Sequence, residues 1–162
     1  MTFERLLELP STWTCVWGRF GLHLFQGELC IADMDRLEAV GAELRRARPG
    51  KTVELSLVLP SDARLSDAER TRMTQLIRRW EKDRVASATV ILAEGLRGSL
   101  QRSVLTGLLM VVPPPHPSKV FGTVEEAVAF LFPHVRTLPG CAATQRQLLA
   151  AVHESYEAFR TR

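Results

Sequence analysis

A glycine-containing turn with two arginines offers the clearest chemistry in this sequence. The turn reads GLRGS from Gly95 to Ser99, follows an apolar run at residues 88–92, and leads into a helical pattern that carries Arg102. A helix N-terminus presents unpaired N–H groups and a partial positive charge, and glycines let a ligand approach the backbone. Two guanidinium groups can grip a phosphate or carboxylate with forked hydrogen bonds. The predicted anion site therefore consists of Arg97, Gly98, Ser99 and Arg102.

A plainer interpretation of the same turn stays open. The string matches neither G-x-x-x-x-G-K-[ST] nor G-x-G-x-x-G, so it carries no nucleotide-binding motif. A capped helix with exposed arginines would use the same residue types. The two interpretations differ in whether Arg97 and Arg102 converge on one point in space.

The histidines and cysteines form no catalytic or metal-binding motif. No G-x-S-x-G or H-E-x-x-H string occurs around His23, His116, His134 or His153. We interpret His23 as a strand-surface residue and His116 as part of a proline loop. The cysteines are far apart and lack C-x-x-C spacing, and we expect the first two to be small core residues: Cys15, Cys30 and Cys141. We therefore expect no catalytic residue, no metal, no cofactor and no enzymatic activity.

Apolar periodicity places these residues in an α/β domain. Strand patterns and helix patterns alternate after an opening hairpin. The predicted strands cover residues 12–19, 22–29, 53–59, 88–92 and 119–121. The predicted helices begin near Asp33, Ser66, Leu96, Thr123 and Thr144. Asp33 is expected to be the N-cap of the first helix, and Ser66-x-x-Glu69 is a capping box. In the helix from Leu96, the inward positions are Leu100, Val104, Leu105 and Leu108.

The chain length of 162 residues corresponds to about one domain. We divide it into an N-terminal arm at 1–11, an α/β domain at 12–135, and a C-terminal helical extension at 136–162. The arm is expected to form one amphipathic helical turn that ends at Pro10. The extension carries an apolar stripe that packs on the same protomer or against a second subunit or partner: Leu148, Leu149, Val152, Tyr156 and Phe159.

Composition argues against nucleic-acid and membrane binding. The chain is 46% hydrophobic and 24% charged, with a formal net charge of +3. Its arginines alternate with acids, which is typical of solvated helix faces and not of a basic stripe. The first ten residues lack a long apolar segment, and the run at 108–115 is too short to span a bilayer. We expect a cytoplasmic protein.

Three local patterns stand out: GELCIADMDRLEAV at a strand-to-helix step, VELSLVLPSDARLS at a strand-to-loop step, and KVFGTVEEAVAFL near the end. They resemble the STAS domain, the fold shared by anti-sigma-factor antagonists and the cytoplasmic tails of sulphate transporters. The resemblance covers residues 12–135 and also rests on the order of elements. It implies a mixed, mostly parallel sheet of about five strands backed by helices, with an extra C-terminal helix.

The resemblance also implies a non-enzymatic switch. In antagonist STAS domains a partner kinase phosphorylates a serine in an Asp-Ser-Ser/Thr-Gly-Leu motif after the third strand, and the added charge changes partner binding. The matching loop here, 60–66, keeps a serine at Ser61 but lacks the following Ser/Thr-Gly-Leu. An ordinary loop serine is the alternative, and Ser66 reads as a helix cap. With the neighbouring turn, the loop forms the predicted interaction surface: Ser61, Asp62, Arg64, Ser66, Arg97, Gly98, Ser99 and Arg102.

We therefore predict a non-catalytic protein-interaction module in bacterial cytoplasmic signalling. A homodimer through the C-terminal helix or an edge strand is one arrangement that this prediction allows. The alternative is a small-ligand protein that binds a nucleotide, phosphometabolite or lipid at the turn from Gly95 to Arg102. An exposed patch would favour the interaction module, and a closed cavity beneath the turn would favour the ligand binder.

Overall fold

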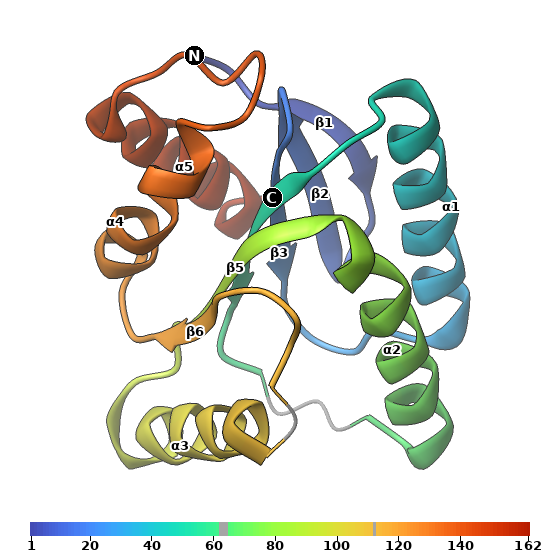
Figure 1. Ribbon diagram of the computed structural model, residues 1–162. Helices are drawn as coiled ribbons and strands as arrows, with labels where there is room; N and C mark the ends of the chain where they lie inside the picture. The colour runs from blue at the N-terminus through green and yellow to red at the C-terminus, as the bar shows by residue number, and fades with distance from the viewer. Residues whose placement is uncertain (62–64, 112) are drawn as a thin grey trace.

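Residues 1–61, 65–111 and 113–162 are the part of the chain that the computed structural model describes, and they contain a six-stranded mixed sheet. Helices cover both faces of this sheet (Figure 1). The strands lie side by side in chain order: β1 Glu4–Glu8, β2 Thr12–Trp17, β3 Phe20–Phe25, β4 Thr52–Val58, β5 Arg84–Ile91 and β6 Ser118–Phe121. The first three strands pair antiparallel, and β3 to β6 pair in parallel.

The helices divide into groups by the region of the sheet that they cover (Figure 1). Helices α1 and α2 cover one face, and helices α4 and α5 cover the opposite face. Helix α3 lies beyond the carboxyl ends of the parallel strands. The bounds are α1 Ile31–Ala47, α2 Asp67–Trp80, the 3-10 turn η1 Glu81–Asp83, α3 Gly95–Val111, α4 Val124–Val135 and α5 Gln145–Arg160. This α/β architecture confirms the predicted fold class, with one more strand than expected.

The additional strand is β1, and the predicted helical turn at the N-terminus was wrong. Glu4 pairs with Val16 and Glu8 pairs with Trp13 of β2. The register shifts between Arg5 and Leu7, which marks an irregularity in the ladder. This shift breaks the strict two-residue alternation that identifies a strand in a sequence. The strand therefore depends on its partner β2, which is a tertiary contact.

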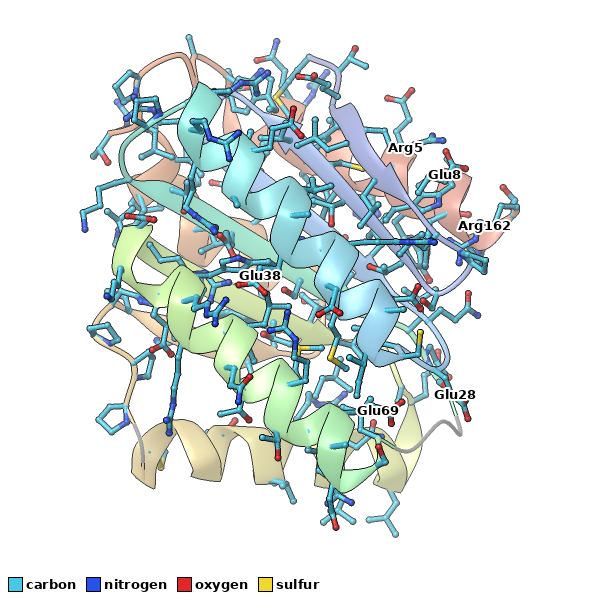
Figure 2. The ribbon with its side chains drawn as sticks, turned by 90° about the vertical axis from the view of Figure 1, so that its right-hand side faces the viewer. Arg5, Glu8, Glu28, Glu38, Glu69 and Arg162 are labelled. Carbon is cyan, nitrogen blue, oxygen red and sulfur yellow. The ribbon has the colours of Figure 1, made fainter. Side chains whose placement is uncertain are left out.

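The main core lies between one face of the sheet and the pair α4–α5. Leu22, Leu55 and Leu57 point from the sheet into this core and are fully buried. Phe159 of α5 is equally buried, and its ring lies 5.3 Å from that of Trp13 in an edge-to-face arrangement. The C-terminal helix thus packs on its own domain. At the β1 side, Arg162 covers Phe159 and lies close to Arg5 and Glu8 (Figure 2).

Helices α1 and α2 share a separate, smaller core on the opposite side of the sheet. Its buried members are Leu29, Met34, Leu37, Leu76 and Trp80. Glu38 of α1 lies between the two helices (Figure 2) and forms salt bridges with Arg72 and Arg79 of α2. This core also contacts the sheet, because Phe25 of β3 packs against it.

The helix caps follow the sequence signals with one exception. Ser66 forms the expected capping box with Glu69, and Thr123 and Thr144 cap their helices. Asp33 was wrongly assigned as a cap, because α1 begins at Ile31 and Asp33 lies in its first turn. There its carboxylate still interacts favourably with the positive end of the helix dipole. The expectation of a core position was also wrong for Cys30, which is exposed.

Within these described ranges, no helix combines the length and the apolar character that crossing a bilayer requires.

Candidate functional site

The predicted interaction surface lies at the carboxyl edge of the parallel strands. Ser61 follows β4, and Ser66 is engaged as the cap of α2, where its hydroxyl accepts a hydrogen bond from the Glu69 N–H at 3.3 Å. Asp62 and Arg64 lie outside the described residues, and so does the side chain of Arg97. A hollow of about 360 Å³ brings the Ser61 loop next to α3, and its lining includes Gly27, Ser61, Ala93 and Gln101.

The turn from Gly95 to Arg102 is anchored to the end of β5. Arg102 donates from Nη1 to the carbonyl oxygens of Ile91 and Ala93, both at 3.2 Å, and from Nη2 to Ser99 Oγ at 3.3 Å. Gly98 is buried, and a Cβ at this position would lie 1.7 Å from the Ala93 oxygen. The Arg102 guanidinium therefore ties the start of α3 to the sheet, and the anion clamp stays a prediction.

One side of α3 exposes a line of apolar side chains. We call this line the α3 stripe, and its members are Leu96, Leu100, Val104 and Met110, which are 88%, 63%, 57% and 78% exposed. The first three follow a four-residue spacing, so they share one helix face. The prediction of an inward position was wrong for Leu100 and Val104. Gly98 and Arg102 contact the end of β5 on the other side of the helix, and the side chains of Leu105 and Leu108 lie outside the described residues.

A second site, which sequence reasoning missed, is a groove over the sheet between α2 and the connection that contains Pro114 and His116. Its volume is about 410 Å³. We call it the hydroxyl groove, because Ser56, Ser87, Thr89 and Ser118 line it. Strand register sets the four side by side: Ser56 opposes Thr89, and Ser87 opposes Ser118. Residues two apart on a strand point the same way, so these hydroxyls share one face.

A buried charge cluster lies at one end of the groove. The Glu54 carboxylate contacts the guanidinium of Arg84 and lies 3.7 Å from His23 Nε2. Burial by itself would raise the pKa of Glu54, but the Arg84 guanidinium and the hydrogen bond with the neighbouring His23 ring outweigh burial and lower it to about 2. Glu54 is therefore ionised at neutral pH and forms a buried ion pair with Arg84.

His23 is buried in this cluster, so its interpretation as a strand-surface residue was wrong. Its Nδ1 lies 3.2 Å from Thr14 Oγ1. Its ring stacks on Trp80 at 5.8 Å and on Phe25 at 6.2 Å. The imidazole is held by groups from β2, β3 and α2, which are distant in the sequence.

His116 connects the proline-rich segment to the floor of the groove. It is 9% exposed, its Nε2 lies 3.0 Å from Ser87 Oγ, and Ser87 donates to Ser118 Oγ at 2.9 Å. Burial, followed by the nearby charge of Arg84, lowers the pKa of His116. The imidazole is therefore neutral at pH 7, with one nitrogen as donor and the other as acceptor.

His116 and Ser87 do not form a serine triad with an acid among the described residues. In a serine triad an acid holds the second nitrogen of the histidine, but His116 Nδ1 has no hydrogen-bond partner among the described residues. Across the same residues, no group of three or more His, Cys, Asp or Glu side chains is arranged to hold a metal ion.

Comparison with known proteins supports the fold. No protein-family profile matches the chain, and no curated protein matches it significantly. A solved structure from Shewanella loihica PV-4, an uncharacterized protein of the DUF3478 family with a SpoIIAA-like fold, aligns with a TM-score of 0.55 and 15% identity. The alignment covers 80% of this chain and 92% of that one. The chain has a SpoIIAA-like, STAS-like fold. This confirms the fold predicted from the order of elements.

Proposed function

We propose that this chain is a non-catalytic protein-interaction module of the bacterial cytoplasm and that the α3 stripe is its docking surface. The observation that carries the proposal is the exposure of Leu96, Leu100, Val104 and Met110 along one helix. Large apolar side chains gathered on a surface mark an interaction site more often than isolated ones do. Spacing of four residues is the pattern by which a helix places anchors into an apolar groove of a protein partner.

The Ser61 loop extends this docking surface. It adjoins α3 across the hollow that Ser61 and Gln101 both line. Phosphorylation of Ser61, which the STAS resemblance suggests, would add a charge of about −2 beside the start of α3. Such a charge would change the docking of an apolar partner, which gives a phospho-switch a physical basis here.

The alternative of an anionic-ligand site at the turn from Gly95 to Arg102 has less support. The Arg102 guanidinium already donates to two backbone carbonyls. Moving it to an anion would leave those carbonyls without its hydrogen bonds. The hollow next to the turn is open at the surface and includes backbone and apolar groups from Phe25, Val58 and Leu59.

Introducing negative charges on α3 tests the docking proposal. We expect Leu96→Glu/Leu100→Glu to abolish capture of a specific bacterial protein, because the variant places two carboxylates in an apolar contact. The matched control is Ile31→Glu, since Ile31 is a 42% exposed apolar residue on α1. Quantitative pull-down with mass spectrometry should find a protein that the α3 variant loses and the control keeps.

The purified partner must then bind the wild-type chain with a defined stoichiometry by calorimetry. Equal capture by the wild type and the α3 variant would refute the docking proposal. Unchanged circular dichroism and thermal unfolding of the variant are required, so that the loss can be assigned to the surface. Light scattering distinguishes self-association, because a dimer lost in the variant would make the partner a second copy.

A further inference from the structure

We propose that the hydroxyl groove binds an uncharged small molecule that carries a hydroxyl or carboxamide group next to an apolar body. This site is separate from the α3 stripe. Its ligand is of a different chemical class from the anion predicted for the turn at Gly95. The proposal rests on the floor, the charge balance and the walls of the groove.

The floor of the groove holds hydroxyls with unused hydrogen-bonding capacity. Ser56 and Thr89 oppose each other on β4 and β5 and are both half-buried. Neither hydroxyl has a hydrogen-bond partner within the described ranges, and Ser118 accepts from Ser87 with its own hydrogen left over. Hydroxyls in such positions bind either water or a ligand, because an unsatisfied polar group is costly.

His116 adds an imidazole nitrogen with unused hydrogen-bonding capacity beside these hydroxyls. It is 91% buried, since 9% of its surface is exposed, and its Nδ1 lacks a partner in the described part of the chain. The flanking prolines restrict the backbone that carries it. A neutral imidazole and hydroxyls both donate and accept. The complementary ligand group is therefore one that also donates and accepts, such as an alcohol or a primary amide.

The charges in the groove disfavour an anion. Arg84 is already paired with Glu54, and Glu81 also lines the groove. His116 is neutral at pH 7, so no unpaired cation among these lining groups is left to bind phosphate or carboxylate. A charged ligand would lose its hydration without a counter-ion, which is expensive in a partly buried site.

The walls of the groove are apolar, and they determine the chemical character of the rest of the ligand. Phe25, Leu65, Met73 and Ile77 line it from β3 and from the α2 side, and Pro114 closes the other side. Apolar walls with a few placed polar groups are typical of small-molecule sites, and a volume of about 410 Å³ lies within their usual range. The ligand is thus an amphipathic molecule whose polar end faces the strands.

Three probes with the same body and different charge test this proposal. They are 4-phenylbutanamide, 4-phenylbutanoate and 4-phenylbutylamine, each titrated into the isotope-labelled full chain and followed by NMR. We expect the amide to shift the backbone resonances of Ser56, Ser87, Thr89 and Ser118. It should bind about tenfold more tightly than the acid or the amine, the equivalent of one or two hydrogen bonds.

Matched variants assign the binding to the hydroxyls. Ser56→Ala/Thr89→Val keeps the shape of the floor and removes two hydroxyls, so we expect the amide affinity to fall about fivefold or more. Ser103→Ala changes an exposed serine on α3 and should leave the affinity unchanged. Absence of shifts in the groove, equal or tighter binding of the charged probes, or an unchanged affinity of the double variant would each overturn the proposal.

Discussion

At the scale of single residues, the buried ion pair of Glu54 and Arg84 is the most consequential feature. Their side chains are 15% and 11% exposed, so each charge depends on the other for solvation. A buried pair contributes little net stability relative to well-packed apolar residues, but removing one member leaves an uncompensated buried charge. The main effect of the pair on stability is therefore the cost of losing either partner alone.

We expect Glu54→Gln to lower the free energy of unfolding by about 3 kcal/mol, because Arg84 would lose its counter-ion. Glu54→Leu/Arg84→Met should recover most of this loss. Glu125→Gln, which breaks the exposed pair with His153, should cost about 0.5 kcal/mol or less. Urea unfolding at pH 7 measures all three, and a Glu54→Gln effect no larger than that of Glu125→Gln would contradict the assignment.

The Glu54 carboxylate also makes the free energy of unfolding depend on pH, and its pKa gives the sign of that dependence. The pKa of Glu54 in the folded chain is about 2, below its ordinary value of 4.5. Its contribution is therefore fully present above pH 4.5 and is lost as the pH falls toward 2. Unfolding measured across this window should show a flatter pH profile for Glu54→Gln than for the wild type.

At the scale of elements, the start of α3 is tied to the end of β5. Arg102 binds the carbonyls at the end of β5, and Gly98 lets the helix approach the Ala93 oxygen closely. Leu96, Leu100 and Val104 lie along the exposed side of the same helix. A helix that is anchored at its start and exposes an apolar stripe suits docking.

Two alanine substitutions in α3 separate this packing from helix propensity. Gly98→Ala should displace the helix and lower stability, since the new Cβ would lie 1.7 Å from the Ala93 oxygen. The new Cβ of Gly107→Ala would have no described atom within 4 Å, so this variant should raise stability by up to about 1 kcal/mol. Amide hydrogen exchange across α3 measures the difference. Similar exchange in both variants would mean that the close approach at Gly98 is not important.

At the scale of the whole molecule, the sheet separates the main apolar core from a side that combines a smaller apolar core with polar groups. The α4–α5 side is filled by leucines, valines and Phe159, whereas the α1–α2 side carries His23, Glu54 and the hydroxyls of the groove. Stability is therefore concentrated on one side and binding capacity on the other. This division leaves the groove open without exposing the main core.

Phe159 tests whether the last helix belongs to the folding unit. We expect Phe159→Ala to cost about 3 kcal/mol or more, because the ring is fully buried against the sheet. Phe130→Ala, at a half-buried position on α4, should cost clearly less. Equal unfolding free energies for the two variants, measured in urea, would show that α5 folds independently of the sheet.

Local sequence patterns determined the element order, most of the caps and the STAS-like fold class. Periodicity, capping residues and prolines act over a few residues, so a single sequence carries them. The alternation of Glu54 and Ser56 with buried leucines also indicated a polar face of β4, and Ser87 and Thr89 repeat the pattern on β5. This alternation of polar and apolar residues could have located the floor of the hydroxyl groove.

Only the tertiary structure decided which faces are covered and which residues meet. Strand register brings Ser87 against Ser118, and the proline connection sets His116 above them. The anchoring of Arg102 to β5 turned Leu100 outward, although its spacing alone fits either face. Burial and pairing between distant segments depend on how the layers pack, and that packing follows from the whole chain and not from any local pattern.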